Sequence, residues 1–184
     1  MSHVTVLLLF DDKTNDSFSR LALEASGRIG KRWRTATYLT KTRVVHYPFH
    51  LCLSSRIAPK HAAGITRIMR RLAAKTRPFD VGFDGFGMFK ADLNVLWART
   101  HPPATRRLQR LHDEVTRAIN TVTPHTHTYN SFTPHVSIFA DRGDIAKTLF
   151  RNWSRQGFRK VARATHLGVL VRTDSNYRIT RFAL

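Results

Sequence analysis

Two short segments of the chain place a histidine beside a small polar residue with the same spacing. They are His50 to Leu53, with the sequence HLCL, and His135 to Ile138, with the sequence HVSI. Alternation of polar and apolar residues is typical of a strand that turns one face to a core, so the histidine and the small polar residue share the opposite face. An unperturbed imidazole has a pKa of about 6.5, and two imidazoles can act as general base and general acid near neutral pH. The segments therefore predict proton-transfer chemistry.

The elements predicted around the two segments follow the same order. Each histidine strand is preceded by a helix, at residues 17–28 and 104–120, and is followed by a helix and two more strands. The histidines themselves lie 85 residues apart, at positions 50 and 135. A constant offset indicates two similar lobes related by pseudo-symmetry, which would bring the two histidine strands together.

The length and composition fit one domain with a real core. The chain has 184 residues, of which 42% are hydrophobic. We interpret residues 1–184 as a single domain made of two pseudo-repeated lobes, with the histidine strands near residues 49–54 and 133–139. His101-Pro102-Pro103 interrupts the pattern, so we expect the chain to cross between the lobes near residues 101–104.

The charge of the chain favours a polyanionic partner. Lys and Arg number 31 against 12 Asp and Glu, which gives a net charge of +19. Nucleic acid is the favoured partner, and we expect arginines on two predicted helices to steer it. These arginines are Arg67, Arg70, Arg71, Arg106, Arg107, Arg110 and Arg117. An anionic membrane surface is a weaker alternative, because the basic residues form no single amphipathic stripe.

Two further features concern the compartment. The single cysteine, Cys52, excludes an intrachain disulfide and is typical of a reducing environment. The apolar run from Val4 to Phe10 is too short to span a bilayer and is interpreted as a buried strand. We expect a soluble intracellular protein with no membrane association.

Paired imidazoles suit cleavage of a phosphodiester without a metal ion. One takes a proton from the attacking hydroxyl, the other supplies one to the leaving oxygen, and Ser137 can hydrogen-bond the phosphoryl oxygens. His125 and His127 lack a nearby Cys, Asp or Glu, so they make a poor set of metal ligands. We expect no metal and no cofactor.

These residues resemble the motifs of the two-histidine (2H) phosphoesterases, and most of all those of the enzymes that trim the 3′ end of U6 spliceosomal RNA. The similarity lies in residues 49–54, in the six-residue step from Tyr129 to His135, and in the ending from Gly168 to Leu184. The resemblance implies a two-lobed, pseudo-symmetric α+β fold in which antiparallel sheets line a central groove and helices lie outside. It also implies attack of a ribose 2′-OH on the adjacent phosphate, which leaves a 2′,3′-cyclic phosphate that some members open to a 3′ phosphate.

The resemblance assigns roles to individual residues. It implies that His50 and His135 are the catalytic pair, that Ser137 is the phosphate-binding hydroxyl of the second motif, and that Tyr129 stacks on the terminal uridine. Cys52 departs from the family, which has Ser or Thr there, and a thiol is a weaker hydrogen-bond donor. Ser54 lies two residues further along the same face and could replace it in binding the phosphate.

The sequence thus predicts a metal-independent 3′-5′ exoribonuclease acting on uridine-rich 3′ ends. The expected partner is the 3′ end of single-stranded RNA, the expected state is a monomer, and the compartment is nuclear for a U6-like substrate and otherwise cytoplasmic. One alternative is a bacterial or archaeal type of 2′-5′ RNA ligase that opens 2′,3′-cyclic phosphates. Another is a catalytically weak RNA-binding module, which the Cys52 departure favours.

Overall fold

The chain folds into one curved antiparallel sheet with helices on its outer side. The computed structural model describes residues 2–27, 36–39, 44–90, 93–123, 132–141, 143–173 and 176–184, and all structural statements refer to these residues. In chain order its elements are β1 (His3–Phe10), α1 (Asp12–Gly27), β2 (Ala36–Leu39), β3 (Val44–Tyr47), β4 (His50–Ile57), the 3-10 turn η1 (Pro59–His61), α2 (Ala62–Ala73), β5 (Phe79–Lys90), β6 (Asn94–Thr100), α3 (Pro102–Asn120), β7 (His135–Asp141), α4 (Ile145–Gln156), β8 (Lys160–Arg172) and β9 (Tyr177–Ala183).

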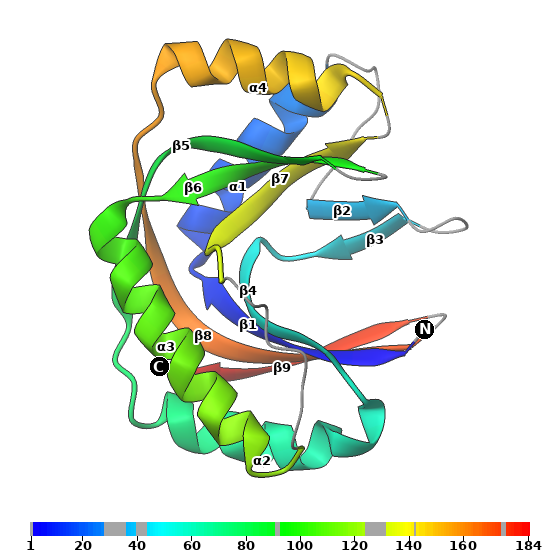
Figure 1. The fold of residues 1–184 in the computed structure, drawn as a ribbon, viewed down its shortest axis with the longest axis vertical. Helices are drawn as coiled ribbons and strands as arrows, with labels where there is room; N and C mark the ends of the chain where they lie inside the picture. Colours follow the sequence, from blue (N-terminus) through cyan, green and yellow to red (C-terminus); the bar gives the residue numbers. More distant parts are fainter. Residues whose placement is uncertain are drawn as a thin grey trace.

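Seven strands form the main sheet in the order β1-β4-β7-β6-β5-β8-β9, and β2 and β3 form a separate hairpin. The long strand β8 joins the two halves, because its first residues pair with β5 while its later residues pair with β1 and β9. Strands β4 and β7 meet at the middle of the sheet. In Figure 1 the sheet curves like a letter C around an opening, and the β2–β3 hairpin lies at the open side.

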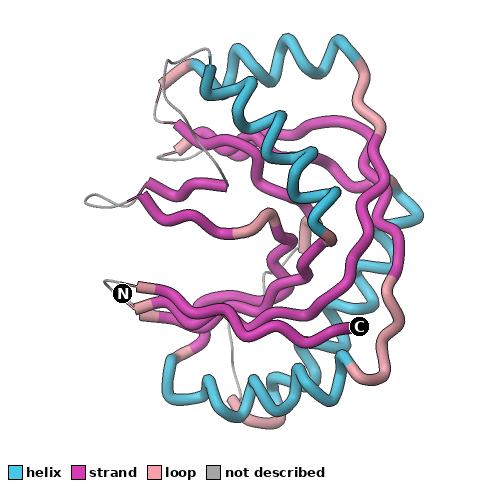
Figure 2. The backbone as a smooth tube through the Cα atoms, turned by 180° about the vertical axis from the view of Figure 1, so that it is seen from behind, coloured by secondary structure: helices cyan, strands magenta, loops and turns pink. Residues whose placement is uncertain are grey.

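The helices cover the convex side of this sheet. α4 packs on β5, β6 and β7, and α1 packs on β7, whereas α2 packs on β8 and β9 and α3 on β4 and β5. The view from behind in Figure 2 shows the same arrangement, with the helices outside the curve of strands. The prediction of antiparallel strands around a groove with helices outside is confirmed.

Most of the core lies between the helices and the convex face of the sheet. Phe18 of α1 is fully buried, and its ring centre lies 5.6 Å from that of Phe49 and 5.4 Å from that of Phe83. Burying side chains of this size stabilises the fold by about 1.5–3 kcal/mol each. A smaller cluster of Leu7, Leu9 and Leu170 lies apart from this core. The face of the sheet that carries the histidines is therefore not part of the main core.

Some predicted helix and strand boundaries differ from the observed ones. The first helix begins at Asp12. The Asp11 carboxylate accepts a hydrogen bond from the backbone nitrogen of Thr14, in the first turn, at 2.9 Å. The predicted start of this helix, residue 17, therefore lies inside the observed helix. The histidine strands, predicted at residues 49–54 and 133–139, run from 50 to 57 and from 135 to 141. His101-Pro102-Pro103 leads into α3 with proline in its first turn, where the missing N–H costs nothing.

Candidate active site

The two histidine segments lie side by side at the centre of the sheet. Leu51 of β4 pairs with Val136 of β7, and both side chains are fully buried. In the first four residues of each strand, partly exposed and buried positions alternate in the same order. Because neighbouring residues of a strand point to opposite faces, the histidine and the small polar residue of each segment lie together on the concave face. The predicted alternation is confirmed in both strands.

The register of this strand pair places four polar side chains in one square. Continuing the antiparallel pairing by one residue on each side of Leu51 and Val136 sets His50 across from Ser137 and Cys52 across from His135. Each histidine is then diagonal to the other and directly opposite the small polar residue of the other motif. The square therefore gathers two imidazoles, one hydroxyl and one thiol on the concave face.

Both imidazoles are held in the same orientation by backbone carbonyls. Nδ1 of His50 lies 2.7 Å from the Pro48 oxygen, and Nδ1 of His135 lies 2.7 Å from the Thr133 oxygen. A carbonyl oxygen can only accept a hydrogen bond, so Nδ1 carries the proton in each ring. Nε2 is therefore the nitrogen that can exchange a proton with a ligand in both histidines.

The surroundings lower the pKa of both histidines below the ordinary value of 6.5. For His50 the main cause is burial, which disfavours the charged ring, and the charge of His135 lowers its pKa further. Burial also lowers the pKa of His135. In each case the backbone hydrogen bond to Nδ1 opposes the effect without cancelling it. The electrostatic effect of His135 on His50 indicates that the two imidazoles are close enough to influence each other's protonation.

Two aromatic side chains that sequence reasoning did not propose lie against His135. The Phe89 ring centre is 4.9 Å from that of His135, and the Trp97 ring centre is 5.5 Å from it. Trp97 of β6 pairs with Ser137 of β7, which places it on the same face as the histidines. The alternation of Trp97 and Arg99 along the predicted strand indicates that both side chains share one face. It does not reveal which strand lies beside them, so it could not place Trp97 next to His135.

The segment that leads into β7 is fixed by contacts from α3 and β6. The Thr100 hydroxyl donates to the Pro134 oxygen at 3.2 Å. The buried His112 ring stacks on Phe132 at 4.1 Å, with an angle of 2° between the ring planes, and its Nδ1 lies 2.7 Å from the Leu53 oxygen. These contacts hold the chain immediately before His135. Tyr129, the predicted uridine platform, lies outside the described residues, as do His125 and His127.

The other two predicted phosphate contacts differ from each other in exposure. The thiol of Cys52 is partly exposed on the concave face and donates to the Ser54 oxygen at 3.6 Å. Ser54 is only 3% exposed. The Ser54 side chain is therefore much less accessible than the Cys52 thiol, and its role in place of Cys52 stays a prediction.

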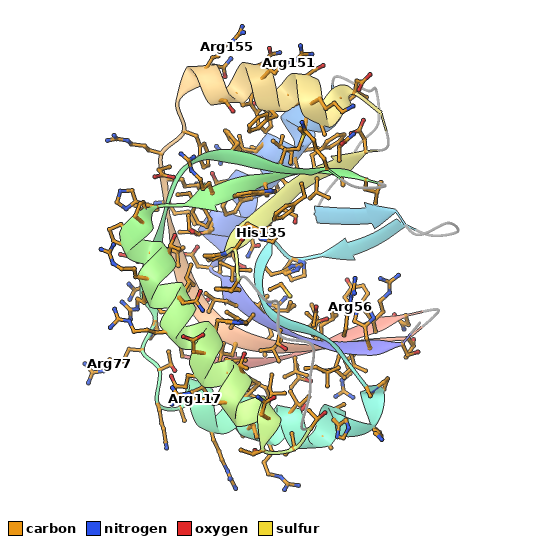
Figure 3. The ribbon with its side chains drawn as sticks, in the orientation of Figure 1. Arg56, Arg77, Arg117, His135, Arg151 and Arg155 are labelled. Atoms are coloured by element: carbon orange, nitrogen blue, oxygen red, sulfur yellow. The ribbon has the colours of Figure 1, made fainter. Side chains whose placement is uncertain are left out.

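Three arginines of the two predicted helices lie outside the site. Figure 3 shows Arg117 of α3 on the outer side of the molecule, away from His135. The Arg107 guanidinium lies 4.1 Å from the centre of the Phe79 ring, and that of Arg70 lies 5.7 Å from the centre of Phe182. Because α2 and α3 cover the convex face, these three arginines lie away from the histidines. In Figure 3, Arg56 of β4 instead faces the opening.

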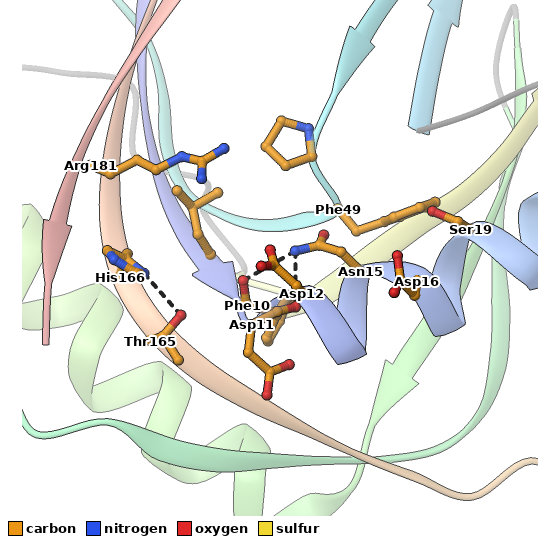
Figure 4. Close-up of a pocket in the computed structure, with 12 residues that line it drawn as sticks. Phe10, Asp11, Asp12, Asn15, Asp16, Ser19, Phe49, Thr165, His166 and Arg181 are labelled. Atoms are coloured by element: carbon orange, nitrogen blue, oxygen red, sulfur yellow. Dashed lines mark hydrogen bonds between the residues drawn. The ribbon is translucent and has the colours of Figure 1, made fainter.

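A cavity of about 560 Å³ lies beside the histidine square and does not include either histidine. It is lined by Leu9, Phe10, Asp11, Asp12, Asn15, Asp16, Ser19, Pro48, Phe49, Thr165, His166 and Arg181. Figure 4 shows it between the start of α1 and the strands that carry His166 and Arg181. Its wall reaches the two residues before His50, so it adjoins the site on the His50 side.

Within the described residues, no three His, Cys, Asp or Glu side chains come together in a group that could hold a metal ion. The same part of the chain contains no helix that is long and apolar enough to cross a membrane.

Comparisons with known proteins match both the sequence and the fold. A family model described as the 2′-5′ RNA ligase superfamily matches residues 24–176. The structure is similar to Usb1 of Kluyveromyces marxianus, with 15% identity and a TM-score of 0.62 over 99% of this chain and 98% of Usb1. It is also similar to TT0787 of Thermus thermophilus, with 13% identity and a TM-score of 0.62 over 100% of this chain and 98% of that chain. LigT of E. coli, complexed with 3′-AMP, has 13% identity and a TM-score of 0.59 over 100% and 98% of the two chains. No curated protein matches the chain.

The structural similarities extend over whole chains at low sequence identity, so they establish the fold. The family model covers both histidine strands and the elements between them. The predicted fold and the predicted enzyme class, a phosphodiesterase of the 2H type, are confirmed together. The chain therefore belongs to the 2′-5′ RNA ligase superfamily, a family of two-histidine phosphoesterases.

Proposed function

We propose that this protein is a metal-independent RNA phosphodiesterase in which His50 and His135 act as general base and general acid. The observation that carries the proposal is that β4 and β7 pair through Leu51 and Val136, which brings His50 and His135 onto one face, each with Nδ1 held by a carbonyl. Two imidazoles that share one face and whose Nδ1 atoms are held by carbonyls can serve both ends of a displacement at phosphorus through Nε2, without a metal ion.

The proposed reaction uses Nε2 of each histidine, since Nδ1 is held by a carbonyl in both rings. One neutral imidazole accepts the proton of the ribose 2′-OH as its oxygen forms a bond to the adjacent phosphorus. The other imidazole, protonated, gives its proton to the 5′ oxygen as the bond from phosphorus to that oxygen breaks. Ser137 donates to a phosphoryl oxygen during this step. The products are a 2′,3′-cyclic phosphate and a released nucleoside with a free 5′-OH.

The substrate we propose is the 3′ end of single-stranded, uridine-rich RNA, which a monomer of this protein shortens in the 3′ to 5′ direction. The support is similarity of fold to Usb1, one structure of which holds uridine monophosphate, together with Tyr129 as an aromatic platform for a base. The cyclic phosphate is the expected end, and its opening would give a 3′ phosphate. A U6-like RNA would place the protein in the nucleus.

The proposal is tested with oligouridine labelled at either its 5′ or its 3′ end, incubated with the protein in excess chelator. We expect the 5′-labelled strand to shorten stepwise and the remaining strand to end in a cyclic or 3′ phosphate. His50→Ala and His135→Ala should each abolish cleavage with the fold intact by circular dichroism, whereas His61→Ala in the turn η1 should not. Retained activity in either active-site variant, or a requirement for a divalent ion, would refute the proposal.

A second candidate is a 2′-5′ RNA ligase or 2′,3′-cyclic phosphodiesterase. It is favoured by the matched family model and by similarity of fold to LigT. Such an enzyme uses the same histidine pair but acts on an end that already carries a cyclic phosphate. Linear oligouridine with a free 3′-OH distinguishes the two functions, since only the exonuclease shortens it.

A third candidate is an RNA-binding module with weak chemistry, for which Cys52 in place of a hydroxyl is the supporting feature. A protein of this kind would bind oligouridine with an affinity that falls steeply as salt increases, and would release no product. The labelled-strand assay, run at enzyme excess, separates it from the other two.

A further inference from the structure

The concave face beside His135 carries an exposed aromatic ring on a fixed support. Phe89, near the end of β5, is 38% exposed and is one of three large hydrophobic side chains exposed among the described residues. Its ring stacks on Trp97 with 5.0 Å between the centres and an angle of 28° between the planes. The other two exposed side chains, Leu23 and Val161, belong to α1 and β8. Of these three, Phe89 is the one in contact with a catalytic histidine.

The support beneath Phe89 is built by the sheet. Gly87 pairs with Trp97 across β5 and β6, and a side chain on Gly87 would meet ring carbons of Trp97 at 2.2–2.5 Å. Absence of a side chain at this position therefore lets the indole lie flat against the strand. Trp97 is only 9% exposed, and its N–H meets no hydrogen-bond partner in the described part of the chain. Packing, and not a hydrogen bond of its own, holds this ring in place.

We propose that Phe89, supported by Trp97, is a stacking platform for the base of the nucleotide on the His135 side of the scissile phosphate. The proposal rests on the proposed function, which places that phosphate between His50 and His135. An aromatic ring in contact with the histidine that serves one side of the phosphate is within reach of the nucleoside attached on that side. Stacking of a base on an aromatic side chain contributes about 1–3 kcal/mol and tolerates different bases.

The charges on the His50 side of the four-residue square support a base on the His135 side. The cavity beside His50 is lined by Asp11, Asp12 and Asp16, which repel phosphate groups. Among the described residues that line it, one is an arginine, Arg181. The His135 side has Arg99, which pairs with His135 in the sheet register and lies 3.1 Å from Asp84. Arg99 is already paired with Asp84, whereas the three aspartates disfavour a polyanionic strand across the cavity beside His50.

The test compares substrates that differ only in the presence of a base. The dinucleotide UpU and two analogues, each lacking the base on one side of the phosphate, are cleaved by the wild-type protein, Phe89→Ala and Phe89→Trp. We expect Phe89→Ala to lower kcat/KM for UpU by about 5- to 150-fold, the equivalent of the stacking energy. Phe89→Ala should have no effect on cleavage of the analogue that lacks the base stacked on Phe89. Phe89→Trp, which keeps an aromatic ring at this position, should restore cleavage of UpU. Val161→Ala, which removes another exposed apolar side chain, is the control and should match wild type.

A binding measurement keeps the platform testable if the protein cleaves none of these substrates. Wild-type protein and Phe89→Ala are titrated calorimetrically with uridine 3′-monophosphate and with the same ribose phosphate lacking a base. The wild-type protein should prefer the nucleotide, and Phe89→Ala should lose this preference while thermal unfolding stays unchanged. Equal losses on all ligands or substrates, or no loss on any, would overturn the platform. If the wild-type protein prefers the nucleotide to the ribose phosphate without a base but cleaves none of the substrates, the proposed function is overturned and the platform is not.

Discussion

At the scale of single residues, the site depends on how two imidazoles are protonated. Nδ1 of His50 and of His135 each donate to a carbonyl, so proton exchange is confined to Nε2. One ring must be neutral and the other protonated for the displacement to proceed. Because burial lowers both pKa values below 6.5, the protonated ring becomes scarce as the pH rises above neutrality.

The first prediction is therefore an acidic pH optimum. A bell-shaped profile of kcat/KM has its maximum midway between the two apparent pKa values of the free enzyme, and both lie below 6.5 here. We expect the maximum below pH 6.5 and a decline toward pH 8 as the general acid loses its proton. Initial rates of oligouridine cleavage across the acidic and neutral range measure the profile. A maximum on the alkaline side of neutrality would contradict the lowered pKa values.

The second prediction concerns Cys52, whose thiol stands where Ser137 stands in the other motif. Cys52→Ser replaces a weak donor with a hydroxyl on the same face, across from His135. A net hydrogen bond is worth about 0.5–1.5 kcal/mol, so kcat should rise roughly 2- to 10-fold. Ser137→Ala should lower kcat by a similar factor. Single-turnover rates at saturating enzyme report both changes, and a Cys52→Ser variant no faster than wild type would show that this position does not contact the phosphate.

The histidine pair could be predicted from sequence because its signal is local. Alternation over four residues decides which side chains share a face, and the offset from His50 to His135 links the two strands. Phe89 and Trp97 could not be found in the same way. Their contact with His135 depends on the register of β5, β6 and β7, and on an irregularity between Phe83 and Gly85 that changes the pairing of β5. No pattern within either strand specifies that register.

At the scale of elements, helix starts were less predictable than strands. The first helix has Asp11, Asp12, Asp16 and Ser17 near its start, and all are residue types that favour a helix N-terminus. In the structure the helix begins at Asp12, and the Asp11 carboxylate accepts from the Thr14 nitrogen. For α4, Asp144 occupies the N-cap position, but its side chain makes no capping bond. Asp141, at the end of β7, instead accepts from the backbone nitrogens of Ile145 and Ala146 at 3.1 and 3.2 Å.

The third prediction concerns the contact between β5 and β6. Gly87→Ala places a Cβ atom 2.2–2.5 Å from the Trp97 ring, so the indole must move away from its position beside His135. We expect the free energy of unfolding to fall by about 1–3 kcal/mol, the usual effect of overpacking, and kcat/KM to fall with it. Urea unfolding and cleavage rates measure the two effects.

Gly82→Ala is the matched control on the same strand. Its nearest side-chain contact would be the His101 Cβ at 3.4 Å, an ordinary distance, so its stability and activity should stay close to wild type. Equal behaviour of the two alanine variants would show that close approach at Gly87 does not fix the Trp97 ring.

At the scale of the whole molecule, some of the charged side chains lie on a different surface from the histidines. The net charge is +19, and Figure 3 shows Arg117 and Arg155 pointing outward from their helices on the convex surface. The concave face instead carries the histidines and the aromatic pair, and it adjoins a cavity lined by three aspartates. Composition predicts a polyanionic partner as a class of ligand, but it could not say which surface contacts that partner, because charge counts contain no information on sheet curvature.

The last prediction is that the site makes the folded protein sensitive to acid. Because the pKa values of His50 and His135 are lowered on folding, the unfolded chain binds more protons between the folded pKa values and about 6.5. The free energy of unfolding therefore falls as the pH drops from about 7 through this range, by at most about 1.4 kcal/mol per pH unit for each histidine. Urea unfolding of wild-type protein and of a His50→Asn, His135→Asn double variant at about pH 7.5 and about pH 5 isolates this contribution, since the remaining histidines are shared. The wild type should lose more stability than the variant over this interval, and equal losses would show that burial at the groove does not disfavour the charged imidazoles.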